Sequence, residues 1–405
     1  MNVPHTMAYK SLSTMIIRLL LVCVPSLFGT SAFFVSPARA QSADWPMFAG
    51  NAAHTGVNDV ETGTPPLMLN WTKALSAGAL NPVTVEGDRV FVTPLTYFAP
   101  VSPLWALSAT DGSELWNHNF PNVFSVNPPS VQNGLVYVQM GNHAASSRIF
   151  AFHVEDGTIA WSTPYSAQWE RYYAPTLAEG KVFVDGGYYG GMYAFDATMG
   201  DTLFYQGALE QYDQWTPTYA DGVLYTFIAG HLRAHDPSTG QILGTVDVGW
   251  RWAGWSMNTV AVLGDGTAFV IAPPILFAVE PLGMTVLWQR DNFFNGTPTY
   301  SQGVVYANQQ GALQAREAGS GDLLWTFVPP DQLRYPAVIA NGCLYISSDT
   351  KVHALDLSTH AEVWSNDGGG WLSIANGQLY VAGPNGTLTS YTMTPGTPAS
   401  SPHSR

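Results

Sequence analysis

Short apolar stretches alternate with polar turns along most of this chain, with a period of about forty residues. The motif ALSATDGSELW (106–116) places apolar, alternating positions on both sides of an Asp-Gly turn, a pattern that predicts a β-hairpin. Six more copies keep the same length: AFHVEDGTIAW (151–161), AFDATMGDTLF (194–204), AHDPSTGQILG (234–244), AVEPLGMTVLW (278–288), AREAGSGDLLW (315–325) and ALDLSTHAEVW (354–364).

A second hairpin is predicted upstream of the repeated motif. Its turn is Asn133-Gly134 in one unit and Asp221-Gly222 in another, each flanked by β-branched and aromatic residues. Each unit then holds four short strands, which predicts a blade of a β-propeller, because one small sheet buries its faces only against its neighbours. The motif's last position supplies a large ring to fill the wedge between blades: Trp116, Trp161, Phe204, Trp288, Trp325 and Trp364.

The number of blades follows from how the repeat ends. Seven units run from about residue 81 to 366, and an eighth begins at Trp371 but stops after a third strand, 387–393. The stretch 66–73, which contains Trp71, has the character of the missing strand. An N-terminal strand would close the ring and remove an exposed sheet edge. We therefore predict an all-β, eight-bladed propeller of four-stranded antiparallel blades, with seven blades as the alternative.

Both ends of the chain differ from the repeats. Residues 1–40 hold an apolar run after Lys10 and end in Ala38-Arg39-Ala40, which predicts a secretory signal and export to the periplasm or the medium of a bacterium. A retained membrane anchor is the alternative. The propeller is predicted to occupy residues 41–393, followed by a Pro/Ser-rich disordered tail, 394–405.

Charge and cysteine content exclude several function classes. The net charge of −14 becomes −17 when a leader with three basic and no acidic residues is removed, so nucleic acid is not an expected partner. Cys23 lies in the leader, and the remaining Cys343 lies in an apolar run, where a buried thiol is expected. The mature chain therefore has no internal disulfide and no predicted membrane span, and we expect a monomer.

The motif Ala-x-Asp-x-x-x-Gly-x-x-x-Trp resembles the PQQ-like, quinoprotein-type repeat, and residues 44–56 resemble that family's N-terminal signature. The resemblance covers about residues 44–393 and implies one of two functions: quinone-dependent alcohol or sugar dehydrogenation, or binding, as in the small eight-bladed BamB-like members. The positions at which this sequence departs from the family motif suggest weaker docking between some blades. Ser108 and His153 stand where the motif has an acidic residue. Met284 and His360 stand where it has the turn glycine, and Gly244 stands where it has the final tryptophan.

Chemistry of the quinone type needs cations for a tricarboxylate, oxygen ligands for Ca²⁺ and a carboxylate base. The weak candidates are Arg171, Arg251 and Arg334 for the cofactor and Asp213, Asp291 and Asp331 for the ion. All lie in inter-blade loops, where solvated surface roles are the alternative. His231 and His235 are predicted to lie on one strand, facing outward, rather than to bind zinc. We therefore expect no cofactor, no metal and no catalytic residues, with PQQ and Ca²⁺ as the alternative.

Aromatic residues gather in the loops that strand parity places on one face of the disc. Such rings suit recognition of a protein, a peptide or a glycan, and the alternative is that many pack beneath the loops. We predict a non-catalytic scaffold for a protein of the cell envelope, with a PQQ-dependent oxidoreductase or a glycan-binding module as alternatives. The predicted binding face comprises Trp169, Tyr172, Tyr173, Trp215, Trp250, Trp252, Trp255, Phe293, Phe294 and Trp371.

Overall fold

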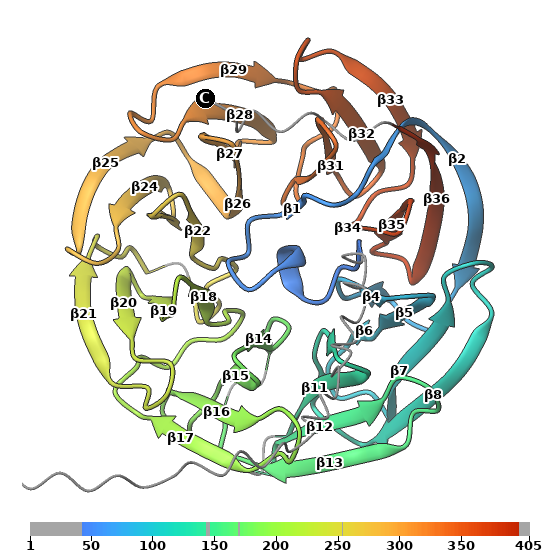
Figure 1. Cartoon of the computed structure of the whole chain (residues 1–405), viewed down its shortest axis with the longest axis vertical. Helices are drawn as coiled ribbons and strands as arrows, with labels where there is room; N and C mark the ends of the chain where they lie inside the picture. Colours follow the sequence, from blue (N-terminus) through green and yellow to red (C-terminus); the bar gives the residue numbers. More distant parts are fainter. Residues whose placement is uncertain (1–42, 143–145, 169–170, 253, 397–405) are drawn as a thin grey trace, which may run out of the picture. The chain divides into compact units, whose positions relative to one another are not determined.

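The structure is a computed structural model that describes residues 43–142, 146–168, 171–252 and 254–396. The predicted signal sequence 1–40 and Trp169 lie outside the described residues. Eight antiparallel sheets surround a common centre, so the predicted eight-bladed propeller is confirmed (Figure 1). Within the described ranges, no helix has the length and apolar character that a membrane span requires.

The blades follow one another in chain order, each running from an inner to an outer strand. Blade 1 comprises β4 (Thr84–Glu86), β5 (Arg89–Val92), β7 (Val101–Ser108) and β8 (Glu114–Pro121), and blade 2 comprises β10 (Ser130–Gln132), β11 (Leu135–Gly141), β12 (Arg148–His153) and β13 (Ile159–Pro164). Blade 3 comprises β14 (Thr176–Ala178), β15 (Lys181–Asp185), β16 (Met192–Asp196) and β17 (Thr202–Gln206), and blade 4 comprises β18 (Thr218–Ala220), β19 (Val223–Ile228), β20 (His231–His235) and β21 (Ile242–Asp247).

The second half of the ring repeats this order. Blade 5 comprises β22 (Val262–Gly264), β23 (Thr267–Ala272), β24 (Ile275–Glu280) and β25 (Thr285–Asp291), and blade 6 comprises β26 (Phe294–Ser301), β27 (Val304–Gln309), β28 (Ala312–Glu317) and β29 (Leu323–Phe327). Blade 7 comprises β30 (Val338–Ala340), β31 (Cys343–Ser347), β32 (Lys351–Asp356) and β33 (Glu362–Asp367). The additional short strands are β9 (Ser125–Val126), which pairs with β11, and the pair of β3 (Ala79–Leu80) with β6 (Pro94–Leu95).

Blade 8 joins the two ends of the propeller, as predicted. It comprises β34 (Trp371–Ala375), β35 (Gln378–Ala382), β36 (Thr387–Pro395) and, as its outer strand, β2 (Gly63–Ala74) from the N-terminal side. The two outer strands are antiparallel, and Gly63 pairs with Pro395 at one end. Strand β36 therefore extends two residues beyond the predicted end of the propeller at residue 393, because β2 is long enough to pair with them.

The repeated motif encodes the contact between neighbouring blades. Its first residue is a buried alanine that pairs across the strands with the last residue, as Ala151 does with Trp161. The ring of that last residue lies over the turn glycine of the next blade, and an added Cβ on Gly157 would lie 2.6 Å from the ring of Trp116. The indole N–H donates to the carbonyl of the motif's fourth residue in the next blade: Trp71 to Ala109, Trp116 to Val154, Trp161 to Ala197 and Trp288 to Ala318.

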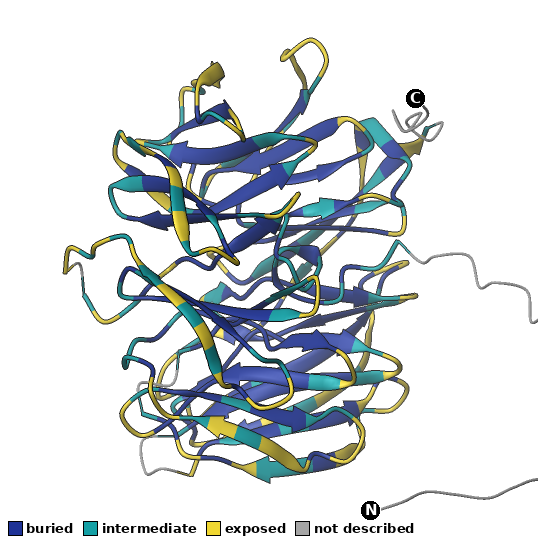
Figure 2. Cartoon of the chain, turned by 60° about the vertical axis from the view of Figure 1, so that its left-hand side comes forward, coloured by how far each residue is buried: buried dark blue, intermediate teal, exposed yellow. Residues whose placement is uncertain are grey.

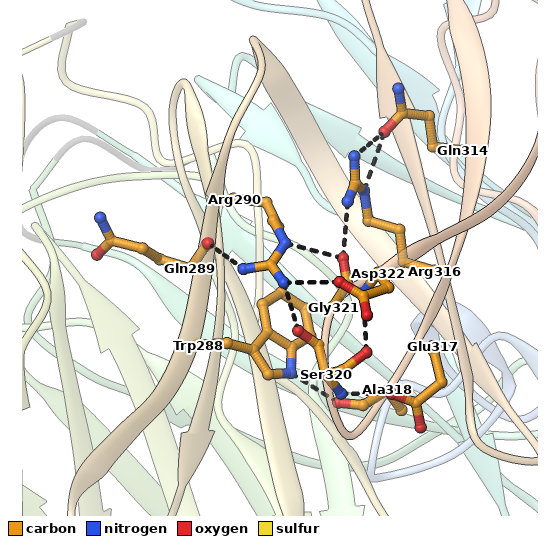
Figure 3. Close-up of polar contacts among 10 residues, drawn as sticks. All are labelled: Trp288, Gln289, Arg290, Gln314, Arg316, Glu317, Ala318, Ser320, Gly321 and Asp322. Carbon is orange, nitrogen blue, oxygen red and sulfur yellow. Dashed lines mark hydrogen bonds and ion pairs between the residues drawn. The ribbon is translucent and has the colours of Figure 1, made fainter.

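Figure 3 shows this contact between blades 5 and 6. The indole of Trp288 donates to the Ala318 carbonyl at 2.8 Å, and Arg290 donates to the Ser320 and Gly321 carbonyls at 2.6 and 3.0 Å. Arg316 of the next blade binds the same Gly321 carbonyl at 2.7 Å. The turn of one blade is therefore held by side chains from both blades.

The departures from the motif are compensated in the structure, so the suggestion of weaker docking is not supported by the contacts. Where Met284 replaces the turn glycine, the preceding blade has Gly244, and an added Cβ there would lie 2.9 Å from Met284 Cγ. Where His360 replaces it, the imidazole stacks on Trp325 at 4.6 Å between ring centres. Where the acid is replaced by Ser108, Asp111 accepts the turn hydrogen bond from Ser113 at 3.0 Å.

The N-terminal segment, residues 43–58, fills the centre of the ring (Figure 1). It includes a short 3₁₀ turn, η1 (Phe48–Gly50), and ends in β1 (Val57–Asn58), which pairs in parallel with β30. We call residues 43–58 the plug. Its carbonyls accept hydrogen bonds from inner-strand amides of six blades, namely those of Val85, Val131, Tyr219, Leu263, Tyr300 and Ile339.

His54 fixes the middle of the plug. It is fully buried, and its two ring nitrogens lie 2.8 Å from the Phe48 carbonyl and 2.9 Å from the Pro217 carbonyl. Burial lowers the pKa of His54 and outweighs the two backbone contacts, which raise it. The plug is therefore a core element that ties distant blades together.

Candidate functional site

Two kinds of loop emerge on each face of the ring. The loops between blades and those between the second and third strands share one face, which we call the loop face. The tight turns after the first and third strands share the other, which we call the turn face. In Figure 2 the inner strands are buried, while loops, turns and outer strands carry the exposed residues. Recognition by side chains is therefore confined to these two faces and the rim.

Exposed aromatic rings concentrate on the loop face over blades 3 to 6. Tyr188 and Tyr189 from the β15–β16 loop are 46% and 75% exposed, and Trp252 and Trp255 from the β21–β22 loop are 60% and 50% exposed. Phe293, between β25 and β26, is 61% exposed. We call these five residues the aromatic crest. Exposed aromatic groups gathered in the loops of one face indicate an interaction site.

The crest has a partly buried aromatic support. The ring of Tyr212 lies 5.9, 6.0 and 6.1 Å from those of Trp250, Trp252 and Trp255. Trp252 and Trp255 also meet edge to face, with ring centres 4.8 Å apart. Such contacts orient the exposed rings before any partner arrives. Tyr212 is therefore placed to position Trp252 and Trp255, and Trp250 packs against Tyr212.

Several residues of the predicted binding face are not on the surface. Tyr172, Tyr173, Trp215 and Phe294 are buried, so their inclusion in an exposed face is wrong. Tyr173 stacks on Phe48 of the plug at 4.5 Å, and the partly buried Trp371 meets Phe48 at 6.0 Å. These rings cover the centre of the ring on the loop face, because the plug presents apolar side chains there.

The three candidate cofactor arginines do not converge. Arg171 lies over the ring of Tyr97 at 4.5 Å and 3.9 Å from Asp213, while Arg334 is exposed and pairs with Asp349 at 2.7 Å. Arg251 is exposed in the loop between blades 4 and 5. The cavity beside Arg171 has a volume of about 40 Å³ and is walled by Tyr172, Tyr173 and Trp371. These residues do not fit a planar tricarboxylate such as PQQ.

The candidate ion ligands are also separated. Asp213 is buried, which raises its pKa, and Asp331 binds His353 at 3.1 Å. Asp291 is exposed at the end of β25. Within the described ranges, no three or more His, Cys, Asp and Glu side chains come together as metal ligands do.

The histidine pair was predicted to face outward, and this is wrong for His235. His235 is fully buried and contacts Thr226 Oγ1 at 2.9 Å and the Gly240 carbonyl at 3.1 Å. Its side chain fills space under the tight turn, which the alternation pattern of the strand does not reveal. Cys343 is buried as predicted, and burial raises its pKa to about 11.

A polar cluster beside the crest was not predicted from the sequence. Glu210 accepts from Arg233 at 2.6 Å, and His231 Nδ1 lies 2.9 Å from the same carboxylate. Nearby, Gln211 donates to Gln168 at 2.8 Å. The contact joins β20 to the loop between blades 3 and 4, so no local spacing signals it. It places fixed polar groups next to the exposed rings.

A family model described as outer membrane protein assembly factor BamB matches residues 102–225, 228–336 and 310–399, more than half of the chain. The chain belongs to this family. The BamB family match agrees with the eight-bladed ring, and the structure of BamB from Moraxella catarrhalis is similar at a TM-score of 0.64 and 15% identity, covering 81% of this chain and 100% of that one.

Quinoprotein structures share the fold with this BamB family member. A europium-containing methanol dehydrogenase has a TM-score of 0.67 at 12% identity, covering 87% of this chain and 99% of that one. The quinohemoprotein alcohol dehydrogenase from Comamonas testosteroni has a TM-score of 0.68 at 13% identity, covering 89% and 82%. At such identities the likeness establishes the fold alone.

One curated relative comes from sequence comparison. The serine/threonine-protein kinase AfsK of Streptomyces coelicolor is 29% identical over 164 residues. The match covers 38% of this chain and about a fifth, 19%, of the kinase.

Proposed function

We propose that this protein is a non-catalytic binding scaffold, exported to the bacterial cell envelope, that holds a protein partner on its aromatic crest. The crest carries the proposal, since five exposed rings from three loops share one face, and two of them, Trp252 and Trp255, rest on the ring of Tyr212. A few residues carry most of the binding energy of protein interfaces, and tryptophan and tyrosine are enriched among them. Membership of the BamB family, whose model is named for an assembly factor, supports a protein as the partner.

Variants of the crest test this function. The triple substitution Tyr189→Ala, Trp252→Ala and Phe293→Ala removes exposed rings from three loops, and Leu115→Ala with Leu324→Ala removes exposed apolar groups from the rim as a matched control. We expect a protein captured from envelope extracts by the wild type to be retained by the rim variant and lost by the crest variant. Equal capture by both variants would contradict the proposal.

A PQQ-dependent oxidoreductase is the alternative that the fold of the quinoprotein structures favours. Titration with PQQ in the presence and absence of Ca²⁺ separates the two functions. Saturable one-to-one binding that is lost on Arg171→Ala would assign the protein to the alternative. A glycan-binding module remains the third candidate, and selective polysaccharide binding that needs Trp252 and Trp255 would favour it.

A further inference from the structure

The connection between β6 and β7 carries a cluster of exposed apolar side chains on the loop face of blade 1. Residues 94–101 read PLTYFAPV and contain no charged residue. Leu95, Tyr97, Phe98 and Val101 are all exposed, and Phe98 is the most exposed of them, at 69%. We call these four residues the apolar tip. Exposed apolar groups gathered in one short segment indicate a contact with a protein or with a membrane.

Phe98 keeps its exposed position against the preference of its backbone. Its φ of 51° lies in the left-handed region, which bulky side chains rarely adopt. Its amide donates to the Phe124 carbonyl at 2.9 Å, and the two rings meet edge to face at 4.8 Å. Glycine or asparagine would adopt this conformation more easily, so the fold itself does not require phenylalanine here. A strained, exposed ring of this kind indicates a binding role.

The blades around the apolar tip are poor in charge. Residues 90–110 and 115–147 contain no Asp, Glu, Lys or Arg. In blade 8, which lies beside blade 1 (Figure 1), residues 368–396 contain none either, and Lys73 is the one charged residue in 62–85. The acidic residues of blades 1 and 2 lie at or beside the tight turns, on the opposite face. The negative charge of this sector is therefore kept away from the apolar tip.

Arg171 separates the apolar tip from the aromatic crest. Its guanidinium lies over the ring of Tyr97 at 4.5 Å and 3.9 Å from the carboxylate of Asp213. The amide of Asp213 in turn donates to the carbonyl of Trp255 in the crest, at 2.9 Å. The two exposed surfaces therefore lie on opposite sides of this pair, and variants of one need not disturb the other.

An uncharged surface around exposed rings fits a lipid bilayer better than it fits a protein. Charged groups are costly to bring toward hydrocarbon, so a surface that inserts has few of them. Tyrosine and other amphipathic rings gather at the depth of the lipid headgroups. Protein-binding surfaces instead combine aromatic residues with arginine, as the crest does with the exposed Arg251 beside Trp252.

We propose that the apolar tip inserts into the headgroup region of a lipid bilayer and docks the propeller there as a peripheral protein. The ring of Phe98 enters the bilayer, and Tyr97 stays at the level of the headgroups beside Arg171. The expected surface is zwitterionic phosphatidylcholine, because the tip has no cluster of basic residues and the chain is acidic overall, so that anionic lipid repels it. This contact goes beyond the proposed scaffold function and uses residues outside the crest.

Vesicle flotation of the chain that begins at residue 41 tests the proposal, because the apolar run of the predicted leader would bind lipid by itself. We expect this chain to float with phosphatidylcholine vesicles. Phe98→Asn should lower the partition coefficient roughly tenfold, since the buried ring supplies much of the binding energy. Asparagine tolerates a positive φ, so the loss would report the missing ring and not misfolding.

Leu282→Asn is the matched control, because Leu282 is a single residue, 73% exposed, on the turn face. We expect it to float like the wild type. No flotation of the wild type would overturn the proposal and leave a protein as the occupant of the tip. Equal flotation of Phe98→Asn and Leu282→Asn would overturn it as well.

Lipid composition and a crest variant separate the tip from the crest. Replacing part of the phosphatidylcholine with phosphatidylglycerol should weaken flotation, and stronger flotation would contradict the proposed surface. Trp252→Asn should float like the wild type. Its failure to float, with flotation retained in Phe98→Asn, would place the lipid contact on the crest and overturn the proposal. Absence of lipid binding together with loss of protein capture by the crest variant would leave the scaffold function intact.

A polarity-sensitive dye at position 98 reports insertion directly. Phe98→Cys introduces one accessible thiol, because Cys343 is buried. With phosphatidylcholine vesicles we expect the emission of the labelled Phe98→Cys chain to shift to the blue, and that of labelled Leu282→Cys to stay unchanged. An unchanged spectrum at position 98 would overturn the proposal.

Discussion

The turn glycines of the two hairpins in a blade, Gly157 in the repeated motif and Gly134 upstream of it, meet different constraints. Gly157 and Gly134 both have positive φ, of 70° and 77°. An added Cβ on Gly157 would lie 2.6 Å from the Trp116 ring, whereas nothing lies within 4 Å of one on Gly134. Backbone conformation is therefore the constraint at both positions, and ring packing is an additional constraint only at Gly157.

Alanine substitutions measure this difference. Gly134→Ala is expected to lower the free energy of unfolding by about 1 kcal/mol through its backbone conformation alone. Gly157→Ala should cost a further 1–3 kcal/mol or so, because the methyl group forces the Trp116 ring to move. Urea denaturation of both variants gives the comparison. Equal losses would show that the ring adapts without cost.

The buried His235 makes stability depend on pH. Burial lowers its pKa from 6.5 to about 4, with smaller effects from Gly240, which raises it, and Arg233, which lowers it. Below pH 6.5 the unfolded chain binds a proton that the folded chain does not, so stability falls as the pH falls from 6.5 toward 4.

Replacing the imidazole tests this dependence. Between pH 7 and 5 we expect His235→Gln to lose about 2 kcal/mol less stability than the wild type does, since one pKa unit corresponds to about 1.4 kcal/mol. The measurement is the unfolding free energy from denaturant titrations at several pH values. Parallel curves for the two proteins would contradict a neutral, buried His235.

The plug is the element that joins the most distant parts of the ring. Hydrogen bonds connect Ala52 to Tyr219, Ala53 to Leu263 and Thr55 to Tyr300, on either side of His54 in the chain. Trp45 and Pro46 bind Val85 and Val131 at the other end of the plug. Hydrogen exchange at these two groups of amides therefore reports separately on the two ends of the plug.

Hydrogen exchange can follow the plug at single amides. In His54→Ala, the carbonyls of Phe48 and Pro217 lose their contacts with the imidazole nitrogens. A buried polar group without a hydrogen-bond partner lowers the free energy of unfolding by about 1–3 kcal/mol. We expect exchange at Tyr219, Leu263 and Tyr300 to accelerate more than at Val85 and Val131. Uniform acceleration would mean that the plug opens only when the whole propeller unfolds.

At the scale of the whole molecule, the ring is closed twice by the same N-terminal region. Strand β2 completes blade 8 along β36, and the plug binds inner strands of six blades. Closure by strand pairing removes a sheet edge, while the plug fills the space that eight inner strands leave between them.

Truncation separates these two contributions. A chain that begins at residue 59 keeps β2 without the plug, and one that begins at residue 75 lacks both. We expect thermal stability to fall from the chain beginning at residue 43 to that beginning at 59, and cooperative unfolding to be lost at 75. Calorimetry of the three proteins is the measurement. A cooperative transition in the shortest chain would show that the remaining blades close without β2.

The sequence alone determined the propeller, its eight blades and the closing strand. Strand alternation and tight turns are local properties, and the same pattern of them recurs in every unit of the repeat. It also located the rings at the blade junctions, since a fixed spacing returns them to equivalent places. The tertiary structure alone decided the rest. The course of the plug depends on contacts such as that of His54 with Pro217, 163 residues away. The burial of Tyr172, Tyr173, Trp215 and Phe294 depends on how the loops and the plug pack around these side chains.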